Sequence, residues 1–387
     1  MILILLSDIS WTGLHQRPHH VALALSKQWR ILWVEPITMG TRIRFLPEEV
    51  EHNIAVVSLP EIPYNARQRT VRKIAQSLSM LGVVRAMISS LQGYLLRRAL
   101  RRLGVEREQR GVVMYSFVLI DAAAKLRPAF THFEYIDNVF GFTTFPAHVR
   151  GQWVRTLQQV DTVTVSSPAL ARQVEPVRGS SVQVVGNGVE YARFAEEAEL
   201  ARPTDLPAGK PIVAYSGAVY PWLDYGLLQE ACSRCTDLNF VFIGPTHPDV
   251  STHVQSLLKL GNVRFLGAKP YASIPSYLQH VDVCMIPFQK NELTTYVNPV
   301  KLYEYCAAGK PCVVTDFSED VLAVRDHVVV ASSREEFLRG LREALARSKD
   351  RHQRVALQSF ARQHDWKVKT SAIIDLIRHQ IAAQEEH

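Results

Sequence analysis

The sequence lacks the features that would hold a protein in a membrane or cross-link it. No apolar run approaches the roughly 18 residues of a transmembrane helix. The apolar start, residues 1–6, is too short for a signal peptide and follows no positive charge. The five cysteines are odd in number and fall in the second half of a chain too long to depend on disulfides. We therefore expect a reduced, cytoplasmic protein, with any membrane association peripheral, on the inner face of the cytoplasmic membrane.

Acidic residues are missing from one stretch, residues 64–105, which holds nine Lys or Arg. The net charge of the chain is +7, so the rest of the chain is close to neutral. Arginines alternate there with leucines, isoleucines and valines at helical spacing, and basic amphipathic helices bind anionic membranes or acidic partners. We expect an anionic membrane surface as partner and no nucleic acid, with the contact made by Arg97, Arg98, Arg101 and Arg102. The alternative is a basic helix face that contacts only solvent.

Short apolar runs alternate with amphipathic helical patterns along all 387 residues, which is typical of an α/β protein with buried parallel sheets. At roughly 150 residues per domain the length favours two domains. A polar segment with two prolines, residues 195–210, predicts the linker. We expect an N-terminal Rossmann-like domain over 1–195, a C-terminal one over 196–370, and a helix over 371–387 that packs on either. The expected strands are 2–6, 31–34, 54–59, 112–116, 132–136, 162–166, 182–185, 212–216, 239–243, 263–265, 283–286, 312–315 and 328–330.

The most informative segment runs from residue 298 to residue 316. Asn298 is expected to cap a helix with Pro299 at its first position, and Gly309 ends it before a buried strand. A helix N-terminus is an anion site, and Lys301 in the first turn is unfavourable against the helix dipole unless an anion binds there. Glu304 lies on a neighbouring face, where a carboxylate can accept hydrogen bonds from ribose hydroxyls. The alternative is a capped helix with one Lys–Glu pair.

Candidate acceptor residues lie on two loops of the first half, each directly after an expected strand, where open α/β sheets bind ligands. Gly13 lies at a strand-to-helix turn, which brings His15 and Arg17 to that edge as candidate contacts for the acceptor or the leaving phosphate. Asp137 ends another strand and is the candidate base or acceptor ligand. The alternatives are a turn with surface His and Arg, and a carboxylate that caps a turn.

Several of these segments together resemble the nucleotide-sugar-dependent glycosyltransferases of GT-B fold, especially the large retaining (group 1) family and its bacterial cell-surface polysaccharide members. The similar segments are the Ala-x-Gly-x-Pro turn and strand after Glu304 (307–314), the glycine turn with Gly217 (215–218), the Asn-Gly-Val segment (185–190), and the Gln-Arg-Pro-x-His opening (11–20). The resemblance implies two Rossmann-like domains facing across a cleft, the second holding the nucleotide-sugar and the first the acceptor. It implies donor contacts by Gly217, Asn298, Pro299, Lys301 and Glu304.

The sequence departs from that family at two places. Tyr296 stands where the family has an earlier glutamate, and residues 220–224 replace its basic pair after the glycine turn. Lys301 is expected to neutralise the leaving diphosphate instead. Retention would let that phosphate take the acceptor proton, whereas inversion would need a base, for which we name Asp137.

We therefore expect a metal-independent glycosyltransferase without a cofactor. Its donor would be a UDP-sugar or GDP-sugar, and its acceptor a glycan or lipid-linked saccharide in bacterial surface polysaccharide synthesis. The catalytic candidates are His15, Lys301 and Asp137. Two other classes stay open: a nucleotide-sugar epimerase of the same fold, which needs no acceptor, and a non-catalytic, membrane-associated partner of a polysaccharide assembly complex, which binds no nucleotide.

Overall fold

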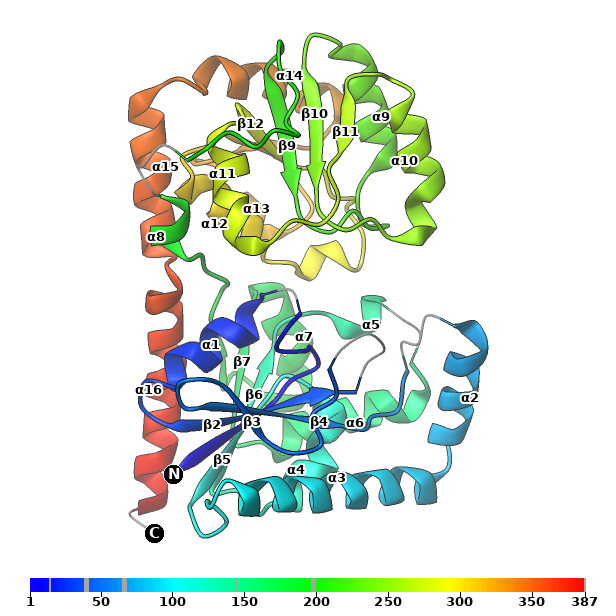
Figure 1. Cartoon of the computed structure of the whole chain (residues 1–387), viewed down its shortest axis with the longest axis vertical. Helices are drawn as coiled ribbons and strands as arrows, with labels where there is room; N and C mark the ends of the chain where they lie inside the picture. Colours follow the sequence, from blue (N-terminus) through cyan, green and yellow to red (C-terminus); the bar gives the residue numbers. More distant parts are fainter. Residues whose placement is uncertain (14, 38–41, 65–67, 143–144, 196–199, 386–387) are drawn as a thin grey trace. The chain divides into compact units, whose positions relative to one another are not determined.

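The computed structural model describes the whole chain except residues 14, 38–41, 65–67, 143–144, 196–199 and 386–387 (Figure 1). Contacts divide the chain into two compact units. Unit 1 comprises Met1–Gly186 and Thr370–His387, and unit 2 comprises Asn187–Lys369. The chain therefore passes from one unit to the other at Gly186 and Asn187, before the expected boundary near residue 195. Each unit is described by itself below.

Unit 1 is built on one sheet with strand order β3-β4-β2-β1-β5-β6-β7-β8 in the described residues. Every neighbouring pair is parallel except β3 with β4. The elements are β1 (Ile2–Leu6), α1 (Arg17–Leu25), β2 (Arg30–Pro36), β3 (Glu48–Glu51), β4 (Ile54–Leu59), α2 (Arg69–Ser79), α3 (Gly82–Arg102), β5 (Arg110–Met114), η1 (Phe117–Leu119), α4 (Ile120–Ala124), β6 (Phe130–Tyr135), α5 (Val139–Phe142), α6 (Ala147–Gln159), β7 (Thr162–Val165), α7 (Pro168–Arg178) and β8 (Val182–Val184).

Unit 2 contains a second, wholly parallel sheet with strand order β11-β10-β9-β12-β13-β14. Counted from the first strand of the unit this is the order 3-2-1-4-5-6 of a Rossmann fold. The elements are α8 (Tyr191–Phe194), β9 (Ile212–Ser216), α9 (Tyr225–Arg234), β10 (Asn239–Ile243), η2 (Pro248–Val250), α10 (Ser251–Leu258), β11 (Val263–Phe265), η3 (Tyr271–Ser273), α11 (Ile274–Gln279), β12 (Val283–Ile286), η4 (Thr294–Tyr296), α12 (Val300–Ala307), β13 (Cys312–Thr315), α13 (Glu319–Leu322), β14 (Val329–Ala331), α14 (Arg334–Arg347) and α15 (Arg351–Gln363). The last helix, α16 (Trp366–Glu385), belongs for most of its length to unit 1.

The central strands are continuous apolar runs because helices cover both faces of each sheet. All residues of β1 and β4 are buried, as are those of β9 and β12. The expected strands are present, with ends that differ by one or two residues at several of them. The sequence prediction missed β3, whose Glu-Glu-Val-Glu sequence alternates between half-buried and exposed positions and carries no apolar run.

The C-terminal helix α16 begins in unit 2 and ends in unit 1. Its Ile373 and Ile377 join the apolar core of unit 1, beside the buried residues of β1 and β2. The final helix therefore packs on the N-terminal unit; the sequence analysis had left open which of the two domains it contacts. The five cysteines are buried and unbonded.

No single helix in the described residues has both the length and the apolar composition to cross a membrane. Helices α2 and α3 reach that composition only together, across a bend of 97° (Figure 1).

Candidate functional site

The expected donor residues of unit 2 gather where its strand order reverses. The sheet runs outward in opposite directions from β9 and β12, and open α/β sheets bind ligands at the carboxyl ends of strands around such a point. Gly217 follows β9, Phe288 follows β12, and α12 begins at Val300 between β12 and β13. The predicted donor residues therefore share one edge of one sheet.

Two strand ends are glycines because their backbones approach closely. Gly217 has a φ of 139°, and Gly244, after β10, has a φ of 154°. A Cβ on Gly244 would lie 2.0 Å from the carbonyl oxygen of Gly217, and a Cβ on Gly217 would lie 2.9 Å from Cε of Lys301. A side chain at either glycine is thus excluded, and the backbone of this corner lies beside Lys301 and the hydroxyl of Tyr215.

Lys301 forms no ion pair with an acidic side chain of the described residues. Its Nζ lies 5.0 Å from the ring centre of Phe288 and 5.5 Å from that of Tyr215. It forms no ion pair or hydrogen bond with any residue that the structure describes. Burial lowers its pKa to about 8, although Glu304 works in the opposite direction. A half-buried ammonium group without a counter-ion, beside a glycine turn, is an arrangement that a bound anion would stabilise.

Glu304, one turn further along α12, is buried, and burial raises its pKa to about 7 against the effect of Lys301. Its Oε1 accepts a hydrogen bond of 3.1 Å from the hydroxyl of Tyr271. Tyr271 is therefore a functional candidate that sequence reasoning missed, since it lies far from Glu304 in the chain and in no motif. At neutral pH Glu304 is close to its titration point and can accept further hydrogen bonds from hydroxyl groups.

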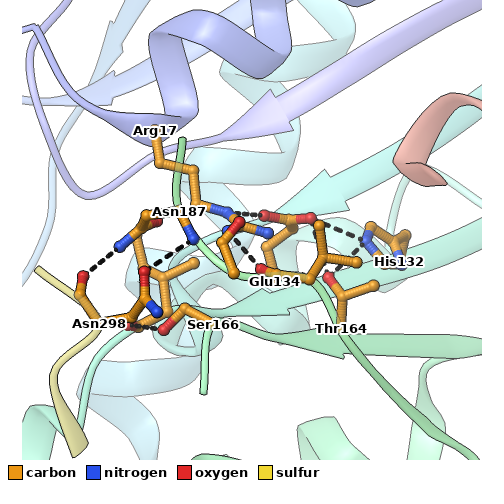
Figure 2. A network of polar contacts seen from close by, with 10 residues as sticks. Arg17, His132, Glu134, Thr164, Ser166, Asn187 and Asn298 are labelled. Carbon is orange, nitrogen blue, oxygen red and sulfur yellow. Dashed lines mark hydrogen bonds and ion pairs between the residues drawn. The ribbon is translucent and has the colours of Figure 1, made fainter. Parts of the chain in front are cut away.

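Asn298 and Pro299 differ from expectation. Pro299, with extended backbone, is the N-cap of α12, and Asn298 precedes the helix. Asn298 is 6% exposed, and its polar groups have protein partners. Its Oδ1 accepts from the backbone N–H of Asn187 (3.0 Å) and its carbonyl accepts from Nδ2 of Asn187 (2.7 Å) (Figure 2). Its Nδ2 donates to the hydroxyl of Tyr303 and to Oδ1 of Asp320. Asn298 thus positions the start of α12 rather than offering its side chain to a donor.

In unit 1, Gly13 and His15 lie on the segment between β1 and α1. The backbone N–H of Gly13 donates to the carbonyl of Ser10 over 3.0 Å, which closes a tight turn. His15 is half-buried, with its ring centre 4.8 Å from that of His19 and 4.4 Å from that of His20. His19 is structural: it is buried, it accepts from the N–H of Gln16, and burial together with His15 lowers its pKa to about 4.

Arg17 is not the accessible residue that the sequence predicted. It is 3% exposed, and its Nε is 2.7 Å from Oε2 of Glu134, which is fully buried (Figure 2). Its Nη1 also donates to the carbonyls of Val185 and Gly186. Burial opposes the ionised form of Glu134, yet Arg17 and then His132 bring its pKa down to about 2. Arg17 therefore holds Val185 and Gly186, at the end of the first segment of unit 1, and its burial and ion pair argue against the predicted contact with acceptor or phosphate.

Asp137 lies just beyond β6 and is half-buried. Burial raises its pKa to about 7, with a further rise from Asp8 and an opposing effect of Arg17. Within the described part of the chain its carboxylate accepts no hydrogen bond, so it is not the side-chain cap of a turn. A carboxylate with a pKa close to neutrality suits a general base.

The four arginines expected at a membrane lie in the last turns of α3. Arg97, Arg101 and Arg102 are exposed and Arg98 is half-buried. Positive charge at this end of a helix also complements the helix dipole, so the arginines alone do not distinguish a membrane contact from a stable helix end.

Part of the chain matches a known family model and a curated protein. Residues 196–359 match the family model described as "Glycosyl transferases group 1". TuaH of Bacillus subtilis (strain 168), named as a teichuronic acid biosynthesis glycosyltransferase, is 27% identical over 225 residues, which are 56% of this chain and 57% of that protein. The match therefore spans little more than half of that curated relative.

Solved structures similar to the chain extend over both units. A sucrose-phosphate synthase from Thermosynechococcus elongatus is 14% identical with a TM-score of 0.71, and 99% of each chain is covered. HepE of Anabaena, solved in complex with UDP-glucose, is 15% identical with a TM-score of 0.66, covering 98% of this chain and all of that one (100%). At this identity the likeness shows the fold. The chain has the two-domain α/β GT-B fold, and its residues 196–359 belong to the group 1 glycosyl transferases.

Proposed function

We propose that the protein is a glycosyltransferase that moves a sugar from a nucleoside diphosphate sugar to a glycan or lipid-linked acceptor in bacterial surface polysaccharide synthesis. The observation that carries the proposal is Lys301, half-buried without a counter-ion against the glycine turn of Gly217, in the segment that matches the group 1 family model. HepE, a protein of the same fold, is solved with UDP-glucose, and TuaH is named for a polysaccharide pathway. Both support this donor and acceptor class.

The residues of unit 2 suit a diphosphate and a ribose. The N–H groups of the first turn of α12 and the ammonium of Lys301 would offset the charge that develops on the leaving diphosphate. Glu304, held by Tyr271, would accept hydrogen bonds from the ribose hydroxyls. The bond between the anomeric carbon and the diphosphate oxygen breaks, and a bond to an acceptor hydroxyl oxygen forms. The acceptor proton goes to the leaving phosphate in a retaining enzyme, or to Asp137 in an inverting one.

The acceptor side of the proposal includes an anionic membrane surface. Exposed apolar residues recur on α3 at Val83, Met87, Leu91 and Tyr94, which are 48–67% exposed. Spacings of four, four and three residues place them along one helix face. We call these four residues the α3 stripe. The next positions of the same face hold Arg98, Arg101 and Arg102, so an apolar surface continues into a basic one, as in helices that lie on anionic lipid.

Vesicle binding tests the membrane contact. Substituting serine for the α3 stripe residues Val83, Met87 and Leu91, or glutamine for the four arginines of α3, should each reduce sedimentation with phosphatidylglycerol vesicles at least about threefold. The matched control is Val355→Ser with Val368→Ser, which removes comparably exposed apolar side chains from unit 2. Equal sedimentation of all variants would remove the membrane from the proposal.

Product analysis tests the transfer itself. The protein is incubated with UDP-sugars and GDP-sugars, with and without short saccharide or membrane-extracted acceptors, and the released nucleoside diphosphate and glycosylated product are measured. The proposal expects both to depend on the acceptor. Conversion of the nucleotide-sugar without acceptor would indicate an epimerase, and an inert protein that binds no nucleotide would indicate a non-catalytic partner.

A further inference from the structure

The loop after β9, residues 218–224, is held against its neighbours at the carboxyl edge of the sheet in unit 2. The backbone N–H of Val219 donates to the carbonyl of Pro245 after β10 over 2.9 Å. The carbonyl of Trp222 accepts from the N–H of Gln289 after β12 over 2.8 Å. The loop thus joins the loops of the two strands that flank β9, which fixes its backbone and the position of its side chains.

Two aromatic side chains of this loop and one of the next form a cluster. The ring centre of Tyr220 lies 4.7 Å from that of Trp222 and 4.8 Å from that of His247. All three residues are half-buried. We call these three residues the aromatic cluster. Residues 218–224 contain no Lys or Arg, so what this loop offers to a ligand is mainly ring surface.

The aromatic cluster continues to Lys301. The ring centre of Trp222 lies 6.5 Å from that of Phe288, and the ring centre of Phe288 lies 5.0 Å from Nζ of Lys301. Trp222 is partly buried against the apolar core of unit 2, which anchors it. The aromatic cluster therefore begins beside the ammonium group that we assign to the diphosphate.

Ring surface of this kind suits a pyranose. A sugar ring carries hydroxyl groups at its rim and C–H bonds on its faces, and the C–H bonds pack against the electron-rich faces of aromatic rings. The hydroxyl of Tyr220 and the imidazole of His247 can exchange hydrogen bonds with hydroxyl groups at the rim. A ligand with both apolar faces and polar edges matches the aromatic cluster better than an anion does, because the loop has no cation for an anion to meet.

The order of groups along the site favours the sugar over the base of the donor. In a nucleotide-sugar the diphosphate joins the ribose to the sugar, and the base continues from the ribose. The ribose is placed at Glu304, which Tyr271, after β11, contacts through a hydrogen bond. The aromatic cluster instead reaches Lys301 through Phe288, from the loops after β9, β10 and β12. The part of the donor attached to the diphosphate on the side away from the ribose is the sugar.

We propose that Tyr220, Trp222 and His247 bind the sugar ring of the nucleotide-sugar donor, with the ring stacked on the aromatic side chains. The inference rests on the proposed function and names the residues that recognise the transferred sugar. It separates two parts of donor binding. Lys301 and Glu304 hold the nucleoside diphosphate, and the aromatic cluster holds what the enzyme transfers.

Calorimetric titration of the full chain tests this separation. The ligands are UDP, GDP, UDP-glucose, UDP-galactose, UDP-N-acetylglucosamine and GDP-mannose. The variant Trp222→Leu keeps an apolar side chain against the core and removes the ring. For a nucleotide-sugar that binds the wild type, we expect the Kd to rise about fivefold in the variant, while the Kd of the matching nucleoside diphosphate changes less than about twofold.

Three further variants control the result. Trp222→Phe keeps a ring and should recover part of the affinity for the nucleotide-sugar. Tyr220→Leu should show the same selective loss, and it tests the aromatic cluster if Trp222→Leu does not fold. Trp29→Leu removes a half-buried tryptophan from unit 1 and should leave both dissociation constants unchanged.

The outcomes distinguish this inference from the proposed function. A wild type that binds no nucleoside diphosphate and no nucleotide-sugar would overturn the proposed function, and the inference with it. Equal losses for nucleotide and nucleotide-sugar in Trp222→Leu, or no loss for either, would overturn only the assignment of the aromatic cluster to the sugar. A wild type that binds a nucleoside diphosphate but no nucleotide-sugar of the panel would also count against that assignment.

Discussion

Arg17 in unit 1 is a buried cation and Lys301 in unit 2 a half-buried one, both near the carboxyl ends of central strands, but their surroundings differ. Arg17 contacts Glu134 and two backbone carbonyls, whereas Lys301 faces two aromatic rings and a glycine. A buried charge paired with a buried carboxylate and backbone carbonyls holds the fold together. A half-buried charge without a counter-ion costs stability, and a bound anion would offset that cost. The same residue class at the same place in the fold thus serves structure in one unit and binding in the other.

The largest expected effect is on the structural cation. Arg17→Met leaves Glu134 buried without its partner, so we expect a loss of about 3–5 kcal/mol in unfolding free energy. Urea unfolding followed by circular dichroism measures it. The double variant with Glu134→Gln should recover part of the loss, because no uncompensated charge remains. A single variant as stable as the wild type would contradict the structural role of Arg17.

The same ion pair has a predicted pH dependence. The folded pKa of Glu134 is about 2, below its usual 4.5, so its contribution is complete above about pH 4.5 and is lost as the pH falls toward 2. The stability difference between wild type and Arg17→Met should shrink over that window.

Substitution of the binding cation should have the opposite signature. Lys301→Met should lower turnover at least about tenfold, because the positive charge that offsets the leaving diphosphate is lost. Its melting temperature should stay equal or rise, since a half-buried charge without a counter-ion is removed. Lys301→Arg, which keeps the charge, is the control and should retain more activity. Full turnover in Lys301→Met would show that the charge of Lys301 is not needed for the reaction, and would contradict the functional difference between the two cations.

Glu304 gives a smaller effect on binding. Glu304→Gln keeps the shape and the partner Tyr271 but weakens the acceptor, so nucleotide affinity should fall about fivefold, or roughly 1 kcal/mol. Isothermal titration calorimetry measures it. Tyr271→Phe removes only the hydrogen bond to Glu304 and should change the nucleotide affinity less than Glu304→Gln does. A larger effect of Tyr271→Phe would assign the contact with the nucleotide to the tyrosine.

The smallest effect is on pH dependence. The pKa of Lys301 is about 8, so its ammonium loses a proton as the pH rises through that value, and diphosphate affinity should decline between about pH 7.5 and 9.5. Glu304, with a pKa of about 7, is mostly ionised over this range. The decline should be absent in Lys301→Met. An equal decline in both proteins would assign it to another group.

The sequence was sufficient for the sheets because buried parallel strands are apolar runs, and Ile2–Leu6 or Ile212–Ser216 can hardly form anything else between helical patterns. It was insufficient for β3, an edge strand with three glutamates. Lys301 could be found because a cation in the first turn of a helix contradicts the dipole. The roles of Arg17, Asn298 and Tyr271 depend on partners distant in the chain, and no local pattern reports those.

One measurement tests the donor site most directly: the melting temperature of wild type and Lys301→Met against UDP, GDP, dTDP and CDP, each with EDTA or magnesium. A ligand at 100 times its dissociation constant adds about 2.7 kcal/mol of stability. We predict that one nucleotide raises the melting temperature of the wild type and raises that of the variant less. No shift with any nucleotide, or equal shifts in both proteins, would contradict the assignment of Lys301 to a nucleoside diphosphate.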